Sequence, residues 1–313
     1  MTTHLLPAAD DTVRVGIIDQ AFEPVLDIDS GDEVVFGIWG SWKDGVKPGM
    51  RFEDIRALKQ AYQGKGPHTI TGPVSVRGAK PGMALKVDVL ELVPCRHGYN
   101  LILPGAQTRG LLADEFPEGE IRHFELDPER MTTEFCPGLT LPLRPFLGIM
   151  GVAPAQAGAH LTSYPGNFGG NIDCPELVEG STLYLPVWVD GARFYAGDAH
   201  AMQGCGEVTQ TALETAMTRA RLRISLAPEL RLKRPRAETA RHVVTLGFDP
   251  DLREAARQAT HDMVDLIVSR SRLSRSQAYT LCSLKVDLMV TQAVNGVNGV
   301  HARLDKAVLE QLA

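Results

Sequence analysis

Hydrophobic and polar residues alternate along much of the first two-thirds of the chain, as they do in half-buried β-strands. In LKVDVLELV (85–93), apolar residues alternate with lysine and aspartate, so that each kind would share one face of an extended strand. EVVFGIW (33–39) is an apolar run typical of a more deeply buried strand. STLYLPVWVDGARFYAG (181–197) predicts two strands joined as a hairpin by a turn at Asp190-Gly191.

Beyond these strands the apolar residues change to helical spacing. VTQTALETAMTRA (208–220) predicts a helix that Glu207 opens. DPDLREAARQATHDMVDLIV (249–268) has Asp249 as its expected N-cap, a proline at the first helical position and an apolar stripe. SRSQAYTLCSLKVDLMV (274–290) begins with a capping-box pattern. The sequence therefore predicts an α+β fold: antiparallel sheets in a barrel-like sandwich, with helices concentrated in the C-terminal third.

Length, composition and charge are those of an ordinary globular protein. The 313 residues are enough for one large or two ordinary domains, and 44% of them are hydrophobic and 22% charged. We expect a single unit, with a candidate subdomain boundary near residues 145–160. The net charge of −6 provides no general attraction to nucleic acid or to an anionic membrane. The basic run 221–236 contains no aromatic residues for base stacking, so we interpret it as a solvated face or connection.

The cysteines and apolar runs indicate a cytoplasmic protein. The five cysteines are odd in number and form no CxxC pair, which favours reduced thiols over a disulfide scaffold or a thiolate zinc cluster. No apolar run approaches the roughly 20 residues of a membrane span. Residues 1–16 lack the charged and apolar regions of a secretory signal. We therefore expect no membrane and no nucleic-acid partner.

Candidate chemistry is found in YAGDAHAMQGCGE (195–207). If this stretch is extended, Asp198 and His200 project from the same face of a strand. Together they could hold a divalent metal such as zinc. Glu207, its charge partly stabilised by the dipole of the expected helix, could be a further ligand or a general base. A structural hydrogen bond between Asp198 and His200 is the simpler alternative.

A second glycine-rich stretch, GAHLTSYPGNFGGNIDCPELVEGSTLYLPV (158–187), surrounds Asn171 and Asp173 with small residues. Glycines let a substrate approach the backbone closely, and exposed N–H groups could stabilise a developing oxyanion. Cys174 and Cys205 also lie in these two stretches, so a thiolate nucleophile is an alternative. It would need a lowered pKa and a nearby base, whereas a small buried thiol is the commoner role of cysteine.

Four segments, in order along most of the chain, resemble the acetamidase/formamidase family. GGNIDCPELVEGSTLYLPVWVDGARFYAGDAHAMQGCGEVTQTALE (169–214) looks like the signature region of that family. HTITGPVSVRGAKPGMALKVDVLEL (68–92) is similar to its TGP-x-x-V-x-GA-x-PGD segment. RPFLGIMGVAPA (144–155) and DLMVTQAVNGVNGVHARLDK (287–306) resemble two further segments of the family.

The resemblance implies an enzyme that hydrolyses the carbon–nitrogen bond of short linear amides, such as formamide and acetamide, and releases ammonia. It also implies a β-rich homo-oligomer, a dimer or larger, with a divalent metal at its site. We expect zinc, with calcium as the alternative. The matched positions imply metal ligands at Asp173, Asp198 and His200, catalytic residues at Glu207 and Asn171, and substrate-binding residues at His68, Gly169, Gly170 and Gly204.

The chain departs from the family pattern at Cys205, where QGCGE replaces the usual QGDGE. Loss of that acid bears on metal affinity and substrate preference. Met83 also replaces an aspartate, which we interpret as a detail of a turn. Two other functions stay open at this point. One is a β-rich protein that binds a metal or small ligand without turnover, because a fold does not guarantee an activity. The other is a hydrolase of a larger amide or imide.

Overall fold

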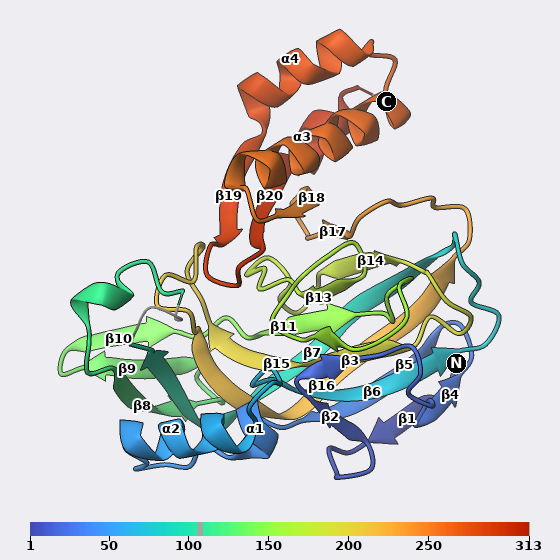
Figure 1. Cartoon of the computed structure of the whole chain (residues 1–313). Helices are drawn as coiled ribbons and strands as arrows, with labels where there is room; N and C mark the ends of the chain where they lie inside the picture. Colours follow the sequence, from blue (N-terminus) through green and yellow to red (C-terminus); the bar gives the residue numbers. More distant parts are fainter. Residues whose placement is uncertain (105–108, 313) are drawn as a thin grey trace.

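The body of the protein is built from β-strands (Figure 1), and the computed structural model describes residues 1–104 and 109–312. In chain order the strands of the body are β1 (Thr3–Leu6), β2 (Val13–Val15), β3 (Ile17–Ile18), β4 (Leu26–Ile28), β5 (Asp32–Ile38), β6 (Thr69–Val76), β7 (Ala84–Ile102), β8 (Glu120–Asp127), β9 (Thr132–Cys136), β10 (Leu139–Pro142), β11 (Phe146–Gly151), β12 (His160–Leu161), β13 (Gly169–Asn171), β14 (Thr182–Pro186), β15 (Phe194–Met202), β16 (Leu213–Ala227) and β17 (Arg236–Glu238).

Most of these strands pair antiparallel. β16 pairs with both β7 and β5, and β15 pairs with β6, β11 and β16. Parallel pairing joins β1 to β5 and β4 to β6. The main hydrophobic core lies between the central strands, and its members include Phe36, Val74, Val87, Phe194 and Leu222. The predicted class, α+β with large antiparallel sheets, is therefore confirmed.

A C-terminal extension projects from this body (Figure 1). It consists of β18 (His242–Asp249), α3 (Leu252–Ser269), α4 (Arg275–Lys285), β19 (Asp287–Gln292), β20 (Asn298–Asp305) and α5 (Lys306–Glu310). The helices of the extension pack on β20 in a second hydrophobic cluster, in which Ala259 and Met263 of α3 lie with Val300 and Leu304. The helices and turns of the body are short: α1 (Ser41–Asp44), α2 (Phe52–Ala61) and η1 (Ala113–Glu115).

The two predicted C-terminal helices are present with small differences at their ends. The N-cap of the first helix is Asp251, whose side chain accepts hydrogen bonds from the backbone amides of Arg253 and Glu254. The expected cap, Asp249, is instead the last residue of β18. The second begins with the predicted capping box of Ser274 and Gln277. It stops at Lys285, because the last part of the predicted stretch pairs with β20 as β19.

The helix expected over 208–220 is wrong, since β16 begins at Leu213. This segment pairs along most of its length with β7 and with β5, and these long-range ladders outweigh its local helical spacing. In the second half of the strand, buried residues alternate with more exposed ones, and Leu222 and Ile224 are fully buried. Because no helix begins at Glu207, the expected stabilisation by a helix dipole is also absent.

The hairpin expected at Asp190-Gly191 is also wrong, although both strands exist. β14 pairs with β7 and β17, whereas β15 pairs with β6, β11 and β16. The turn therefore connects strands of different ladders.

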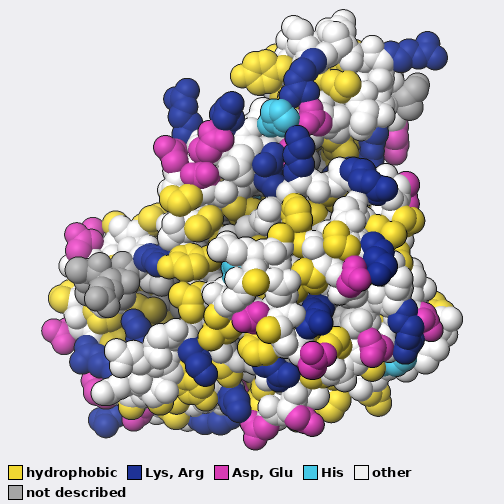
Figure 2. All heavy atoms as spheres, turned by 45° about the vertical axis from the view of Figure 1, so that its right-hand side comes forward, with side chains coloured by type: hydrophobic (Ala, Val, Ile, Leu, Met, Phe, Trp, Pro, Cys, Tyr) yellow, Lys and Arg dark blue, Asp and Glu magenta, His cyan; other side chains and the backbone are white. Residues whose placement is uncertain are grey.

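The surface carries both signs of charge. On the face shown in Figure 2, lysine and arginine side chains are interspersed with aspartate and glutamate. In the basic run 221–236, Arg221 and Arg223 each form an ion pair with Glu33. Among the described helices, none combines the length and the apolar character that a membrane crossing requires.

Candidate active site

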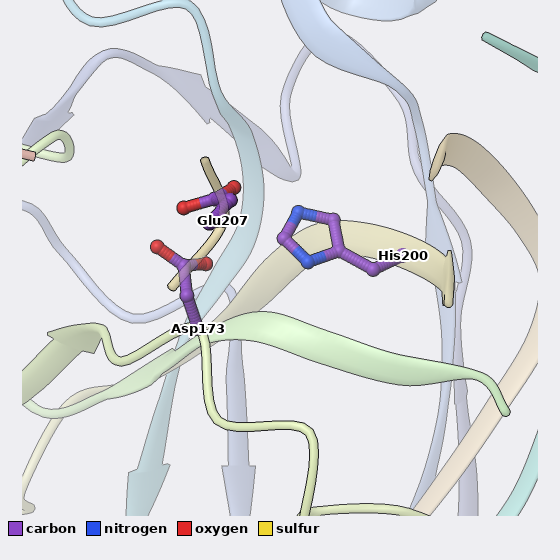
Figure 3. Close-up of side chains that lie close together, drawn as sticks. All are labelled: Asp173, His200 and Glu207. Carbon is purple, nitrogen blue, oxygen red and sulfur yellow. The ribbon is translucent and has the colours of Figure 1, made fainter. Parts of the chain in front are cut away.

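Four ionisable residues from separate segments meet inside the body. Asp198 and His200 lie on β15, Asp173 follows β13, and Glu207 lies in the turn between β15 and β16. Their exposed fractions are only 1% for Asp173 and His200, 5% for Asp198 and 6% for Glu207. Figure 3 shows the side chains of Asp173, His200 and Glu207 directed toward one another. Such complete burial of charged groups is unusual without a partner that compensates for lost hydration.

His200 belongs to two overlapping groups of potential metal ligands. Asp173, His200 and Glu207 each offer a ligand atom within 4.8 Å of the others, and so do Asp198, His200 and Glu214. The imidazole Nε2 lies 3.3 Å from Asp198 Oδ2 and 3.4 Å from Glu214 Oε1. Phe146 packs edge-on against the same ring at a centroid distance of 4.9 Å. The imidazole is thus held in a fixed orientation between the acids.

Gly148 of β11 lies directly beneath this cluster. A Cβ atom at this position would fall 2.5 Å from Asp198 Oδ2, 2.6 Å from Asp173 Oδ1 and 2.8 Å from the Cε1 atom of His200. Such distances are well inside van der Waals contact. The three side chains predicted as metal ligands therefore pack around the same small space, which is free because residue 148 has no side chain.

The backbone is strained at three of these residues. Asp173, Asp198 and Glu207 have φ angles of 48°, 56° and 50°, which lie in the left-handed region that residues other than glycine rarely adopt. Each such residue costs about 1–3 kcal/mol and persists only where the surrounding structure enforces it. Asp198 and His200 lie two residues apart on β15 and reach the same cluster, although the backbone at Asp198 is left-handed.

Several buried polar atoms of the cluster make no hydrogen bond among the described residues. They include Asp173 Oδ1, His200 Nδ1 and Glu207 Oε2. Buried polar atoms are normally satisfied, and those that are not point to a function or a bound group. A divalent cation coordinated by these oxygens and a ring nitrogen would satisfy them. Mixed nitrogen and carboxylate ligands are the set that zinc prefers, so the residues present fit the expected metal.

Crowding of acids shifts the pKa values within the cluster. Burial, reinforced by the charges of Asp198 and Glu214, raises the pKa of Asp173 to about 8. Burial and the Asp173 charge raise the pKa of Glu207 well above its usual range. Burial opposes ionisation of His200, but the charges of Glu214 and Asp198 outweigh it and raise the His200 pKa. Without a cation, the raised pKa values keep part of the acids protonated near neutral pH, whereas a bound cation would favour their ionised forms.

A loop of the C-terminal extension holds Asp173 in place. The Asn295 side chain donates a hydrogen bond of 2.5 Å to Asp173 Oδ2, and Gln203 donates to the backbone oxygen of Asp173 at 3.0 Å. This loop and the end of β19 are fixed to the turn before Glu207, because the Gly206 amide donates to Thr291 O at 3.0 Å and the Ala293 amide donates to Gly206 O at 3.1 Å. Partners of this kind orient metal ligands and strengthen binding.

A cavity of about 260 Å³, hereafter the active-site pocket, opens beside the cluster. Its lining includes Asn171, Asp198, Glu207 and Glu214 at the acidic cluster, together with Trp42, His68, Tyr99 and Arg109. His68 Nε2 lies 4.0 Å from Asp198 Oδ2, and its Nδ1 is hydrogen-bonded to Thr162 Oγ1 at 3.0 Å. The predicted residues His68 and Asn171 therefore do reach the same pocket as the acids.

The three predicted glycines occupy different places. Gly169 and Gly170 have φ angles of 86° and 80°, and a Cβ atom there would fall 2.4 Å from Met150 O and 2.8 Å from the Phe168 ring, respectively. They allow β13 to pack closely against its neighbours. Gly204 lines a neighbouring cavity of about 460 Å³ instead.

The cysteines of the two predicted stretches lie outside the active-site pocket. Cys174 is fully buried, and burial raises its pKa. Cys205 lines the neighbouring cavity, and burial also raises its pKa. Neither environment stabilises the thiolate that a nucleophilic cysteine requires.

Three residues of the site were not identified from local sequence patterns: Gly148, Glu214 and Asn295. Glu214 lies in a segment interpreted as helical, and its approach to His200 depends on the pairing of β15 with β16. Gly148 and Asn295 lie within RPFLGIMGVAPA and DLMVTQAVNGVNGVHARLDK, two of the segments that resemble the family. That resemblance was the only signal in the sequence that pointed to these segments.

Comparison with known proteins agrees with this resemblance. The model of the Acetamidase/Formamidase family matches residues 19–161 and 155–308. An acetamidase crystal structure from Bacillus halodurans is 28% identical, with a TM-score of 0.90 and 99% of both chains covered. A putative formamidase from Schizosaccharomyces pombe is 25% identical over 194 residues, which cover 45% of this chain and 47% of the relative. An acetamidase from Mycolicibacterium smegmatis is 25% identical over 199 residues, covering 45% and 49%. The match thus spans about half the length of these curated relatives.

Proposed function

Because the chain belongs to the acetamidase/formamidase family, we propose that it hydrolyses the carbon–nitrogen bond of small linear amides in a metal-dependent reaction that gives a carboxylate and ammonia. One observation carries the proposal: a buried histidine and several acids converge over Gly148 with unpaired polar atoms facing one another. Membership of the family, together with relatives named acetamidase and formamidase, favours hydrolysis over the alternative of a protein that binds without turnover.

In this proposal Asp173, Asp198 and His200 hold the cation. Zinc is favoured over calcium, because His200 provides a nitrogen ligand whereas calcium takes oxygen ligands. When bound, the cation supplies Lewis acidity toward the amide carbonyl oxygen and toward water. Asn295 keeps Asp173 in position through its hydrogen bond to Oδ2.

Glu207 carries the proton of the reaction. Water attacks the amide carbonyl carbon, and Glu207 accepts a proton from it. The carboxyl group then delivers this proton to the amide nitrogen as the carbon–nitrogen bond breaks, since nitrogen leaves readily only when protonated. Asn171, which lines the pocket, donates a hydrogen bond to the oxygen on which negative charge develops. The atoms balance: one water and one amide give one carboxylic acid and one ammonia.

We also expect a cytoplasmic homo-oligomer, a dimer or larger. All five cysteines are unpaired in the structure, as in a reducing compartment. Leu111, Leu112 and Phe116 expose 54%, 56% and 45% of their surface, and such apolar residues are typical of surfaces that another copy covers. Sedimentation of the purified chain measures the assembly directly.

The test of the proposal is ammonia release from formamide and acetamide. The protein is assayed as purified, after removal of metal by a chelator, and after addition of zinc or calcium. We expect activity to disappear on stripping and to return with zinc. Activity that survives complete removal of metal, checked by elemental analysis, contradicts metal dependence. Absence of ammonia in every state, from these and larger amides, contradicts amide hydrolysis.

Substitution of the proton carrier tests the assignment of Glu207. Glu207→Gln keeps the shape of the side chain but cannot accept a proton, so kcat is expected to fall by about 10²–10⁴-fold. Metal content should stay near that of the wild type. Glu179→Gln, at an exposed position outside the pocket, is the matched control and should be fully active. An active Glu207→Gln variant refutes the assignment.

A further inference from the structure

The active-site pocket is divided by charge. At its inner end lie the buried acids Asp198, Glu207 and Glu214. The other charged residues that line the pocket, apart from His68, are cationic. Lys59 and Lys65 are exposed, whereas Arg109 is half-buried. A substrate in this pocket can therefore contact both the buried acids and a cation.

Arg109 is held firmly in this position. Its Nη2 donates to the Tyr164 hydroxyl at 3.1 Å, and its guanidinium lies over the Tyr164 ring at 5.3 Å from the centroid. The backbone amide of Arg109 donates to Gln210 Oε1 at 2.7 Å. The guanidinium also packs on Gly296, where a Cβ atom would fall 2.7 Å from Cζ and Nη1. Gly296 follows Asn295, the residue that binds Asp173, so Arg109 is anchored next to the acidic cluster.

This guanidinium has no acidic partner in the part of the chain that the structure describes, where every carboxylate lies beyond 4.0 Å from its nitrogens. The hydrogen bond to Tyr164 engages only one of the five N–H donors of an arginine. By contrast, Arg221, Arg223 and Arg234 all form ion pairs with carboxylates. A planar group with several donors facing a pocket is suited to bidentate binding of a carboxylate.

The size of the pocket also exceeds what the smallest amides need. A volume of about 260 Å³ corresponds to roughly nine molecules of liquid water. Formamide and acetamide would occupy a small part of it, which leaves room for a longer substrate that also reaches Arg109.

From the proposed function and this division of charge, we infer that the preferred substrate is the monoamide of a short dicarboxylic acid. Its amide lies at the acidic cluster and its free carboxylate lies on Arg109. The carboxylate takes no part in the chemistry. Water adds to the amide carbonyl carbon, the carbon–nitrogen bond breaks, and the products are the dicarboxylate and ammonia. Lys59 and Lys65 attract the anion to the opening of the pocket.

A pair of substrates tests this inference. Succinamate and butyramide have the same chain length and differ in carrying a carboxylate or a methyl group at the far end. Because a charge-assisted hydrogen-bonded pair is made only with succinamate, its kcat/KM is expected to be about 10–100-fold higher. Equal values, or a preference for butyramide, overturn the inference. They leave the proposed function intact, since butyramide hydrolysis is amide hydrolysis.

Variants then assign the preference to Arg109. In Arg109→Gln the ratio of kcat/KM for succinamate over butyramide should fall to near one. Arg109→Lys, which keeps the charge but not the planar fork, should keep part of it. The matched control Arg253→Gln removes an exposed arginine of α3 and should keep the wild-type ratio. A full preference in Arg109→Gln overturns the role of Arg109.

Succinate binding provides a readout that does not depend on turnover. Calorimetry should show that wild-type protein binds succinate at least about tenfold more tightly than Arg109→Gln does. If neither amide is hydrolysed, the proposed function fails, and this binding measurement still decides the anion site. No binding of succinate to the wild type overturns the inference.

Discussion

The active-site cluster and the C-terminal extension of this protein are built in opposite ways. In the extension, buried positions of α3 are apolar, and the helices begin at side chains that cap their first amides, Asp251 and Ser274. In the cluster, the buried residues are acids and a histidine, and three of them have left-handed backbone. The extension follows local sequence preferences, whereas the cluster violates them. The comparison indicates that the strained backbone of the cluster is held by contacts with the rest of the protein. The helices of the extension are stabilised largely by local features, namely their caps and their apolar faces.

The two regions nevertheless meet at one loop. Asn295, between β19 and β20, reaches from the extension to Asp173. Variants that separate function from stability can therefore test how far the two regions are independent.

The largest effect is expected from Gly148→Ala. The added methyl group would lie 2.5–2.8 Å from the side chains of Asp198, Asp173 and His200, so they must move apart. Displacements near 1 Å in a catalytic site cost about 10²-fold in rate, and we expect a loss of that size together with loss of bound metal. Amide turnover and elemental analysis measure both. Wild-type activity would mean that the three side chains do not converge on a cation.

The same substitution in the extension, Gly247→Ala, should act on stability instead. Here a Cβ atom would fall 2.1 Å from Ala255 O and 2.8 Å from the Ala259 amide, both in the backbone of α3. Forcing α3 away from β18 should lower the free energy of unfolding by about 2–3 kcal/mol. Urea denaturation measures it. Folded Gly247→Ala protein should keep its metal, and metal loss there would show that the regions are strongly coupled.

Acid should weaken the extension through His301. Burial lowers the pKa of His301 on β20 to about 4, so the folded state binds this proton less readily than the unfolded chain does. Its contribution to stability is complete above pH of about 6.5 and is lost as the pH falls toward 4, about 2 kcal/mol of it by pH 5. His301→Gln should remove this part of the pH dependence. Urea denaturation at pH 7.5 and pH 5, with the wild type as reference, measures the difference. An equal pH dependence in both proteins contradicts the prediction.

The smallest effect is expected from Ser274→Ala. The Ser274 side chain accepts from the Gln277 amide at the start of α4, and loss of such a cap costs about 1 kcal/mol. Amide turnover should be unchanged, because α4 is not among the elements that line the pocket. Thermal unfolding measures the loss of stability, and ammonia release from an amide substrate measures turnover. A drop in activity would show that the tip of the extension influences the active-site pocket.

Local patterns predicted those elements whose defining contacts are close in sequence. The capping box at Ser274 is complete within four residues, and α3 buries one face along a single helix. The segment 208–220 has comparable apolar spacing but becomes β16, because its partners in β5 and β7 lie more than a hundred residues away. Sequence spacing could not reveal that pairing.

The site was predictable only in part for the same reason. The spacing of Asp198 and His200 indicated a shared site, and both do reach it, but nothing in the spacing predicted the left-handed backbone at Asp198. Glu207 was singled out in the same stretch as a candidate ligand or base, whereas the role of Asp173 came from the resemblance. Glu214 and Asn295 carry no local signal for a role at the site and arrive there through strand pairing and the loop after β19.

The hydrogen bond from Asn295 to Asp173 also has a consequence for biosynthesis. The site combines residues from His68 to Asn295, so a chain that is still being translated cannot complete it until residue 295 has left the ribosome. Sheet strands can form earlier, since domains assemble progressively during synthesis. In the proposed function, the cation should therefore bind less tightly until translation is nearly complete, because Asn295 does not yet hold Asp173 in place.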